Sequence, residues 1–209
     1  MIKILSVNEI KRKPDLREVT DNEQNKYVVL SETVFLNNIL PEASFERDEW
    51  YGILTESDYK IGLNYALDYI SRGMKTQKEI KNKLFERKIR ENAVEQILTR
   101  LRELDYVNDR KYALEYVGVY SDIRGSIRLR NELYLRGVDR KHIDEALDTL
   151  TDEGPAALNA ALKFTKGREL DNKERERLIR HLLSRGFPYD AVKTALRQMG
   201  KETDDISDL

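Results

Sequence analysis

The sequence predicts a mainly α protein, in which three tandem three-helix repeats form an elongated body behind a small antiparallel β region. Two observations lead to this fold class. The apolar residues follow a strand-like period of two near the N-terminus and the 3.6-residue period of a helix from about Asp58 onward. Within the helical part the apolar pattern recurs at a shift of 49 residues, which is typical of a repeat architecture.

The N-terminal β region covers residues 1–55. Three runs in it are rich in the β-branched and aromatic residues that favour strands. They are Ile2–Val7, Tyr27–Ser31 and Thr33–Leu36. Polar stretches at 11–14 and 21–26 carry turn-forming residues. We therefore expect the three runs to pair as a small antiparallel sheet.

The helical region divides into repeat 1 (56–104), repeat 2 (105–150) and repeat 3 (151–200), followed by an acidic tail (201–209). Equivalent positions in the three repeats carry apolar residues at helical spacing. Examples are Ile80, Leu129 and Leu178, then Leu84, Leu133 and Leu182, then Ile89, Val138 and Phe187. A unit of this size buries its apolar faces poorly alone, so we expect the repeats to stack.

Helix starts are marked by side chains that can accept hydrogen bonds from free backbone N–H groups. These are Thr76 with Glu79, Asp171 with Glu174, Asn108 and Asp139, of which the first two sets have the spacing of a capping box. Gly137 and Gly186 stand where a left-handed residue would end the middle helix of repeats 2 and 3. Lys88 holds this position in repeat 1. Either the backbone is unchanged there, at a cost of about 1 kcal/mol, or repeat 1 turns differently.

The composition excludes several classes of site. The chain of 209 residues has no cysteine and two histidines, His142 and His181, which disfavours a conventional zinc site. No phosphate-binding loop, dinucleotide fingerprint or paired nucleophile and base is present. We therefore predict no enzymatic activity, no metal and no cofactor. No segment has the apolar length of a membrane span or signal peptide, so we expect a cytoplasmic protein without membrane contact.

Positive charge concentrates in the helical repeats, although the net charge is −1. Residues 61–104 hold 10 basic and 6 acidic side chains and residues 151–200 hold 10 and 7, whereas residues 1–60 hold 8 and 12. The basic residues recur around the middle helix of each repeat. We call these sets the basic ridges: Arg72, Lys75, Lys78, Lys81, Lys83 and Arg87 in repeat 1; Arg124, Arg128, Arg130 and Arg136 in repeat 2; and Arg177, Arg180 and Arg185 in repeat 3.

The basic ridges have two interpretations. Stacked repeats could align them as a positive surface that follows phosphates or an acidic protein groove. They could also be ordinary surface charge, because Glu79 with Lys83 and Glu132 with Arg136 have the spacing of helical ion pairs.

Motifs in all three repeats are similar to those of a known family. Similar to the family's first repeat are Tyr69-Ile70-Ser71-Arg72, Lys75-Thr76, Glu79-Ile80, Lys83-Leu84 and the run from Asp105 to Ala113. Similar to its second are Gly125, Arg128-Leu129, Glu132-Leu133, Arg136-Gly137-Val138 and Ile143 with Ala146-Leu147, and similar to its third is Leu182 with Arg185-Gly186-Phe187. They resemble RecX, the bacterial regulatory protein of the RecA recombinase, over about residues 57–199. The N-terminal strands resemble the extra β region of its longer members. Lys88 and Asp105 depart from the family, which usually has glycine at both positions.

The resemblance implies a non-enzymatic regulator, mainly an inhibitor, of RecA in homologous recombination, DNA repair and the SOS response. Such a protein binds in the groove of the RecA filament on single-stranded DNA and limits filament growth, ATP turnover and strand exchange. Double-stranded DNA is a further expected partner, and we expect a monomer. The family's basic positions are matched by Arg72, Lys83, Arg128 and Arg136, and its structural positions by Leu84, Ala113, Leu133 and Gly137.

Two other functions remain open. One is a stand-alone DNA-binding protein of tandem helix-turn-helix units, which would need base-reading side chains at the start of its third helices. Those helices begin Glu91-Asn92-Ala93 and Arg140-Lys141-His142, where only Asn92 suits this role. The other is a helical scaffold that binds proteins alone.

Overall fold

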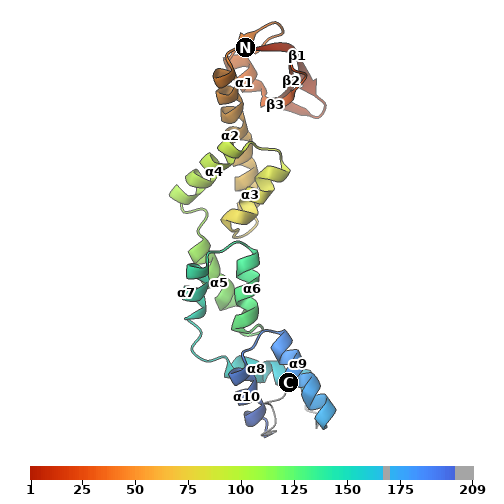
Figure 1. Cartoon of the computed structure of the whole chain (residues 1–209), viewed down its shortest axis with the longest axis vertical. Helices are drawn as coiled ribbons and strands as arrows, with labels where there is room; N and C mark the ends of the chain where they lie inside the picture. Colours follow the sequence, from red (N-terminus) through yellow and green to blue (C-terminus); the bar gives the residue numbers. More distant parts are fainter. Residues whose placement is uncertain (167–169, 201–209) are drawn as a thin grey trace. The chain divides into compact units, whose positions relative to one another are not determined.

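The structure, a computed structural model, describes residues 1–166 and 170–200. The chain forms two compact units, one from Met1 to Val107 and one that begins at Asn108. The predicted class is confirmed, because helices dominate, form three-helix repeats and follow an antiparallel sheet (Figure 1). The predicted acidic tail, residues 201–209, lies outside the described residues, and the division into five segments stays a prediction.

The first unit opens with a four-stranded antiparallel sheet in the order β3-β2-β1-β4. The strands are β1 (Ile2–Ile10), β2 (Lys13–Asp21), β3 (Lys26–Leu30) and β4 (Ser44–Phe45). The expected strand at Thr33–Leu36 is wrong, because these residues lie in the short helix α1 (Ser31–Leu36). Thr33 is buried and Val34 packs against the core of the sheet, whereas Phe35 and Leu36 are 81% and 60% exposed. The run therefore packs as one face of a helix, and tertiary context overrides its strand propensity.

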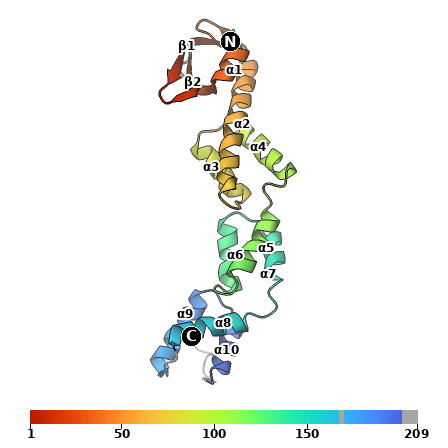
Figure 2. The same cartoon turned by 180° about the vertical axis from the view of Figure 1, so that it is seen from behind.

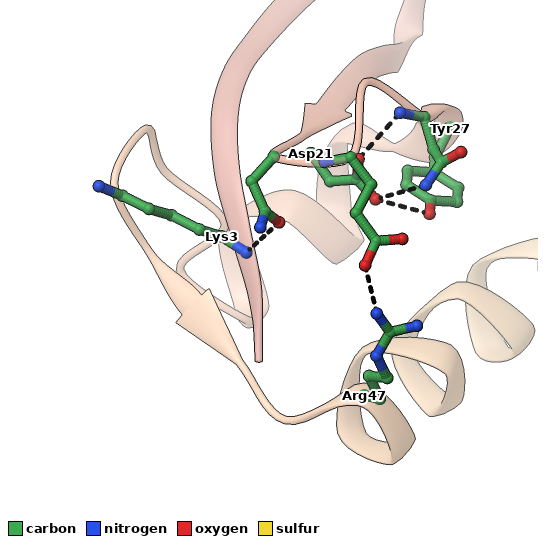
Figure 3. Close-up of polar contacts among 7 residues, drawn as sticks. Lys3, Asp21, Tyr27 and Arg47 are labelled. Carbon is green, nitrogen blue, oxygen red and sulfur yellow. Dashed lines mark hydrogen bonds and ion pairs between the residues drawn. The ribbon is translucent and has the colours of Figure 1, made fainter.

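A buried carboxylate fixes the turn between β2 and β3 (Figure 3). Asp21 accepts hydrogen bonds from the backbone N–H groups of Glu23 and Asn25 at 2.9 and 2.8 Å. The Asn25 side chain and the Tyr27 hydroxyl donate to its second oxygen. Burial alone would raise the pKa of Asp21, but these hydrogen bonds hold it below its ordinary value. Glu23 also pairs with Arg47, the first residue of helix α2 (Arg47–Ser71), which ties the turn to that helix.

Helix α2 (Arg47–Ser71) begins well before the helix start expected near Asp58, so that prediction is wrong. Glu46 and Glu49 form a capping box at its N-terminus, in which glutamate takes the place of the usual serine or threonine. Because the motif lacks serine or threonine, the sequence pattern did not indicate this helix start.

Helix α2 serves both the sheet and repeat 1 (Figures 1 and 2). Trp50 and Leu54 in its first half pack into the core of the sheet. Ala66 in its second half packs into the core of repeat 1, which α2 forms with α3 (Gln77–Glu86) and α4 (Glu91–Glu103). The N-terminal sheet and repeat 1 are therefore built on one continuous helix.

The middle of α2 bonds to elements on both sides. Ser57 Oγ accepts a hydrogen bond from the backbone N–H of Leu30, the last residue of β3, at 2.9 Å. Asp58 accepts hydrogen bonds from the backbone N–H of Arg90 at 3.0 Å and from its guanidinium at 2.6 Å. Arg90 directly precedes α4, so Asp58 holds the start of α4 against α2.

The second unit contains two further three-helix repeats. They consist of α5 (Asp109–Tyr120), α6 (Ser126–Leu135) and α7 (Arg140–Leu147), and of α8 (Gly154–Thr165), α9 (Asn172–Ser184) and α10 (Tyr189–Gln198). The predicted apolar seam is confirmed. Leu129, Leu133 and Val138 and their equivalents in the other two repeats are at most 5% exposed.

Three of the four expected N-caps are confirmed. Thr76, Asn108 and Asp171 each accept a hydrogen bond from a backbone N–H in the first turn of the following helix. Asp139 stands at the predicted N-cap position of α7, but its side chain makes no capping bond. There the N–H of His142 donates to the backbone carbonyl of Asp139 instead.

All three repeats make the same turn after their middle helix. Gly137 and Gly186 have φ values of 81° and 82°, and Lys88 has a φ of 61°. In each repeat the N–H of this residue donates to the carbonyl three residues back, at 2.8 or 2.9 Å. Asp105, also at a position where glycine was expected, has a φ of 54°. Repeat 1 therefore keeps the turn and holds a lysine in a left-handed conformation.

Backbone contacts join repeats 2 and 3 between the start of α6 and the end of α9. The N–H of Gly125 donates to the carbonyl of Arg185 at 3.0 Å, and the N–H of Ile127 donates to that of Gly186 at 3.1 Å. A Cβ added to Gly125 would lie 2.1 Å from the Gly186 oxygen. Only glycine fits this approach of two main chains.

Candidate functional site

Several cations of the basic ridge of repeat 1 form ion pairs within the repeat. The pairs are Arg72–Asp68 at 2.7 Å, Lys81–Glu95 at 2.5 Å and Lys83–Glu86 at 2.7 Å. The hydrogen bond to Glu95 raises the pKa of Lys81. The expected pairing of Lys83 with Glu79 does not form, because the Glu79 carboxylate accepts the backbone N–H of Thr76 in the capping box.

Two other cations of this ridge lie over aromatic rings. Lys75 Nζ is 4.9 Å from the ring centroid of Tyr69, and the guanidinium carbon of Arg87 is 4.9 Å from that of Tyr65. Lys78 is exposed on α3. A tyrosine ring attracts a cation without neutralising it, so Lys75 and Arg87 keep their charge for a partner.

A single glutamate forms ion pairs with two arginines of the repeat 2 ridge. Glu132 accepts hydrogen bonds from Arg124 and Arg128, both at 2.8 Å. The Tyr116 hydroxyl donates to the same carboxylate at 2.9 Å. Burial would raise the pKa of Glu132, but the bonds from Arg128 and Tyr116 and the charge of Arg124 lower it. Two guanidinium groups around one carboxylate leave positive charge in excess.

The remaining arginines of the repeat 2 ridge also have neighbours. Arg130 pairs with Asp144 on α7 and lowers the pKa of that carboxyl group. The Arg136 guanidinium lies 5.3 Å from the ring centroid of Tyr116. These contacts hold α6 against α5 and α7.

Arg185 of the repeat 3 ridge lies in the junction with repeat 2. Its guanidinium donates to the carbonyl of Ile123 at 3.1 Å and to His181 Nε2, also at 3.1 Å. Burial, together with the charge of Arg185, lowers the pKa of His181, which suits a neutral imidazole acting as acceptor. Arg185 therefore binds one repeat to the next, a role that the sequence pattern did not indicate.

The other two arginines of this ridge are exposed on α9. Arg180 is 4.0 Å from Glu176, a weak contact between mostly exposed groups. Arg177 has no ion pair within residues 1–166 and 170–200. Arg177 is thus an exposed cation of this ridge whose charge is not offset by an ion pair in the described ranges.

No group of three or more histidine, aspartate or glutamate side chains within residues 1–166 and 170–200 could hold a metal ion. Over those same residues, no helix has the length and apolar character needed to cross a membrane.

Three-helix repeats with cations grouped around each middle helix define a helical-repeat protein with basic surfaces. Family models of the first, second and third three-helix domains of RecX match residues 63–101, 108–147 and 156–196. The chain belongs to the RecX family and is a regulatory protein of that family.

Named relatives extend this match. The chain is 34% identical to the regulatory protein RecX of Bacillus licheniformis over 154 residues. This alignment covers 71% of this chain and 59% of that protein. It is 26% identical to the regulatory protein RecX of Clostridium acetobutylicum over 207 residues. This alignment covers 95% of this chain and 97% of the relative.

Solved structures share the fold. A crystal structure of regulatory protein RecX has a TM-score of 0.64 at 22% identity, with coverage of 97% of this chain and 100% of the other. The crystal structure of RecX from Lactobacillus salivarius has a TM-score of 0.62 at 28% identity, with coverage of 68% and 97%.

Proposed function

We propose that this protein binds the RecA–DNA filament and acts mainly as an inhibitor, limiting filament growth, ATP turnover and strand exchange. The observation that carries the proposal is the recurrence of excess positive charge around the middle helix in a RecX-family chain. A surface that repeats along a protein suits a polymer whose own charges repeat. In this function the protein is a cytoplasmic monomer without enzymatic activity, and its partners are the RecA filament and DNA.

The basic ridges do not contribute equally to this binding. A cation that already pairs with a carboxylate must give up that contact before it binds a phosphate or an acidic RecA side chain. Lys81 and Lys83 are in this position, whereas Arg177 is not. Arg124 and Arg128 share one carboxylate, so one of the two can bind a partner while the other stays paired. The cations that are available to a partner are therefore fewer than the sequence implies.

Replacing Lys78, Arg128 and Arg177 together with glutamine is expected to weaken binding to the assembled filament about tenfold. The three lie on the middle helices of repeats 1, 2 and 3 and are exposed. Exposed charge contacts contribute about 0.5 kcal/mol each, and about 1.4 kcal/mol corresponds to a factor of ten. Titration of labelled protein onto filaments assembled on single-stranded DNA measures the affinity, and inhibition of RecA ATP turnover should weaken in parallel.

The matched control replaces Lys141, Lys163 and Lys193 with glutamine, which removes the same charge from exposed positions on α7, α8 and α10. Its affinity for the filament should stay close to that of the unchanged protein. An equal loss in both variants would mean that only net charge matters. Full binding by the first variant, with its circular dichroism unchanged, would contradict a role for the ridges.

A further inference from the structure

A cleft in the first unit separates the N-terminal sheet from the turn between α3 and α4. Its volume is 340 Å³, and β2, β3, α2 and this turn form its walls. Figures 1 and 2 both show the turn and the sheet on the same side of α2. Five cations line the cleft: Lys13, Lys26, Arg87, Lys88 and Arg90. The predicted ridges include only Arg87 among them.

The carboxylates in and beside the cleft already have partners. The pairs are Asp58–Arg90 at 2.6 Å, Glu86–Lys83 at 2.7 Å and Glu18–Lys26 at 2.9 Å. No ion pair within the described parts of the chain offsets the charges of Lys13, Arg87 and Lys88. Three cations from two separate elements thus line one cleft without an ion pair among the described residues. The five cations of the cleft also outnumber its two carboxylates, Asp58 and Glu86, which favours an anionic ligand.

The backbone of Lys88 is a second, independent observation. Lys88 has a φ of 61° at the position where repeats 2 and 3 have Gly137 and Gly186. A residue with a Cβ is disfavoured in this conformation, whereas glycine is not. Strained residues of this kind concentrate at functional sites. Because the exposed Lys88 side chain lines the cleft, its charge there is a reason for lysine in place of glycine.

A planar surface lies beside the cations. The Arg87 guanidinium stands over the Tyr65 ring at 4.9 Å, and both residues line the cleft with the apolar side chains of Ile61 and Ile89. Stacked arginine and tyrosine groups accept the exposed bases of single strands, whereas the bases of a duplex are already stacked on one another. The cleft is at the small end of the usual range for ligand sites, roughly 300–1,000 Å³, which suits one nucleotide of a flexible strand.

We propose that this cleft binds single-stranded nucleic acid, with Lys13 and Lys88 on its phosphates and the Arg87–Tyr65 pair against a base. The N-terminal sheet would then share in binding through Lys13. The inference goes beyond the proposed regulation of RecA, because the cleft needs no RecA to hold a strand.

The test uses the full chain without RecA and a fluorescent oligothymidine of roughly 20 nucleotides, longer than one binding site. Replacing Lys13 and Lys88 together with glutamine should weaken binding about tenfold. The slope of log affinity against log salt should become shallower by about 1.4, since each phosphate contact on a single strand contributes about 0.7. Lys11→Gln is the control: Lys11 is exposed in the hairpin beside Lys13 but does not line the cleft, so this variant should bind normally.

A Lys88→Gly variant separates binding from folding. It should raise the melting temperature by about 2–4 °C, because glycine relieves the left-handed turn, and yet weaken binding to the strand. A folding defect cannot produce this combination. Unchanged affinity and salt slope in the folded double variant would overturn the proposal. Equal binding of a duplex, or equal displacement of the strand by polyglutamate, would overturn the assignment to single-stranded nucleic acid. None of these outcomes decides whether the protein binds a RecA filament.

Discussion

Replacing Asp58 with alanine is expected to lower the free energy of unfolding of the first unit by about 3 kcal/mol. The Asp58 side chain is 6% exposed and is the acceptor for both the backbone N–H and the guanidinium of Arg90. Alanine would leave both donors without this acceptor, one of them a partly buried charge. Denaturation followed by the fluorescence of Trp50 measures the loss, because this single tryptophan is buried in the same unit.

The control for this prediction is Asp68→Ala, which removes the exposed carboxylate paired with Arg72 on the same helix. We expect it to change the free energy of unfolding by no more than about 0.5 kcal/mol. If Asp58→Ala cost as little as Asp68→Ala, the pairing of Asp58 with Arg90 could not be what holds α4 against α2.

Replacing Gly125 with alanine is expected to destabilise the second unit by about 2–4 kcal/mol. The added Cβ would lie 2.1 Å from the Gly186 oxygen and 2.2 Å from the Phe187 nitrogen, so the two main chains must move apart. That movement lengthens the hydrogen bonds that Gly125 and Ile127 donate across the junction. Thermal unfolding followed by circular dichroism measures the effect, while Trp50 fluorescence should report an unchanged first unit.

Gly118→Ala is the matched control in the same unit. Gly118 lies inside α5, and a Cβ there would meet nothing within 4 Å. Alanine favours a helix over glycine by up to about 1 kcal/mol, so this variant should be as stable as the unchanged protein or more stable. Similar melting temperatures for the two alanine variants would show that repeats 2 and 3 do not depend on close approach at Gly125.

The repeat architecture could be predicted from the sequence because burial at a fixed helical spacing requires apolar residues at equivalent positions. The strands of the N-terminal region were harder to predict. Strand β2 was missed, because its buried Val19 stands among charged residues and no local apolar run marks the strand, which pairs with β1 and β3. Conversely, Phe35 and Leu36 read as strand residues but are exposed in α1. Both errors arise because pairing and exposure depend on distant parts of the chain.

The sequence located the cations of the ridges but not their partners. Helical spacing allowed Lys83 to pair with Glu79, but the capping box takes that carboxylate. The contact between Arg185 and Ile123 joins two repeats and has no local signature. Comparison of the repeats did single out Lys88, and the left-handed backbone decides between the two possibilities that the sequence left open.

The central claim is that this protein recognises the assembled RecA–DNA filament, and one comparison of affinities tests it most directly. The full chain is titrated at one salt concentration against bare single-stranded DNA, free RecA and the filament. We predict that the filament binds more than about tenfold more tightly than either component, because contacts to protein and to phosphate then act together. Equal affinity for bare DNA and filament would contradict this and favour a stand-alone DNA-binding protein, and equal affinity for free RecA and filament would favour a scaffold that binds protein alone.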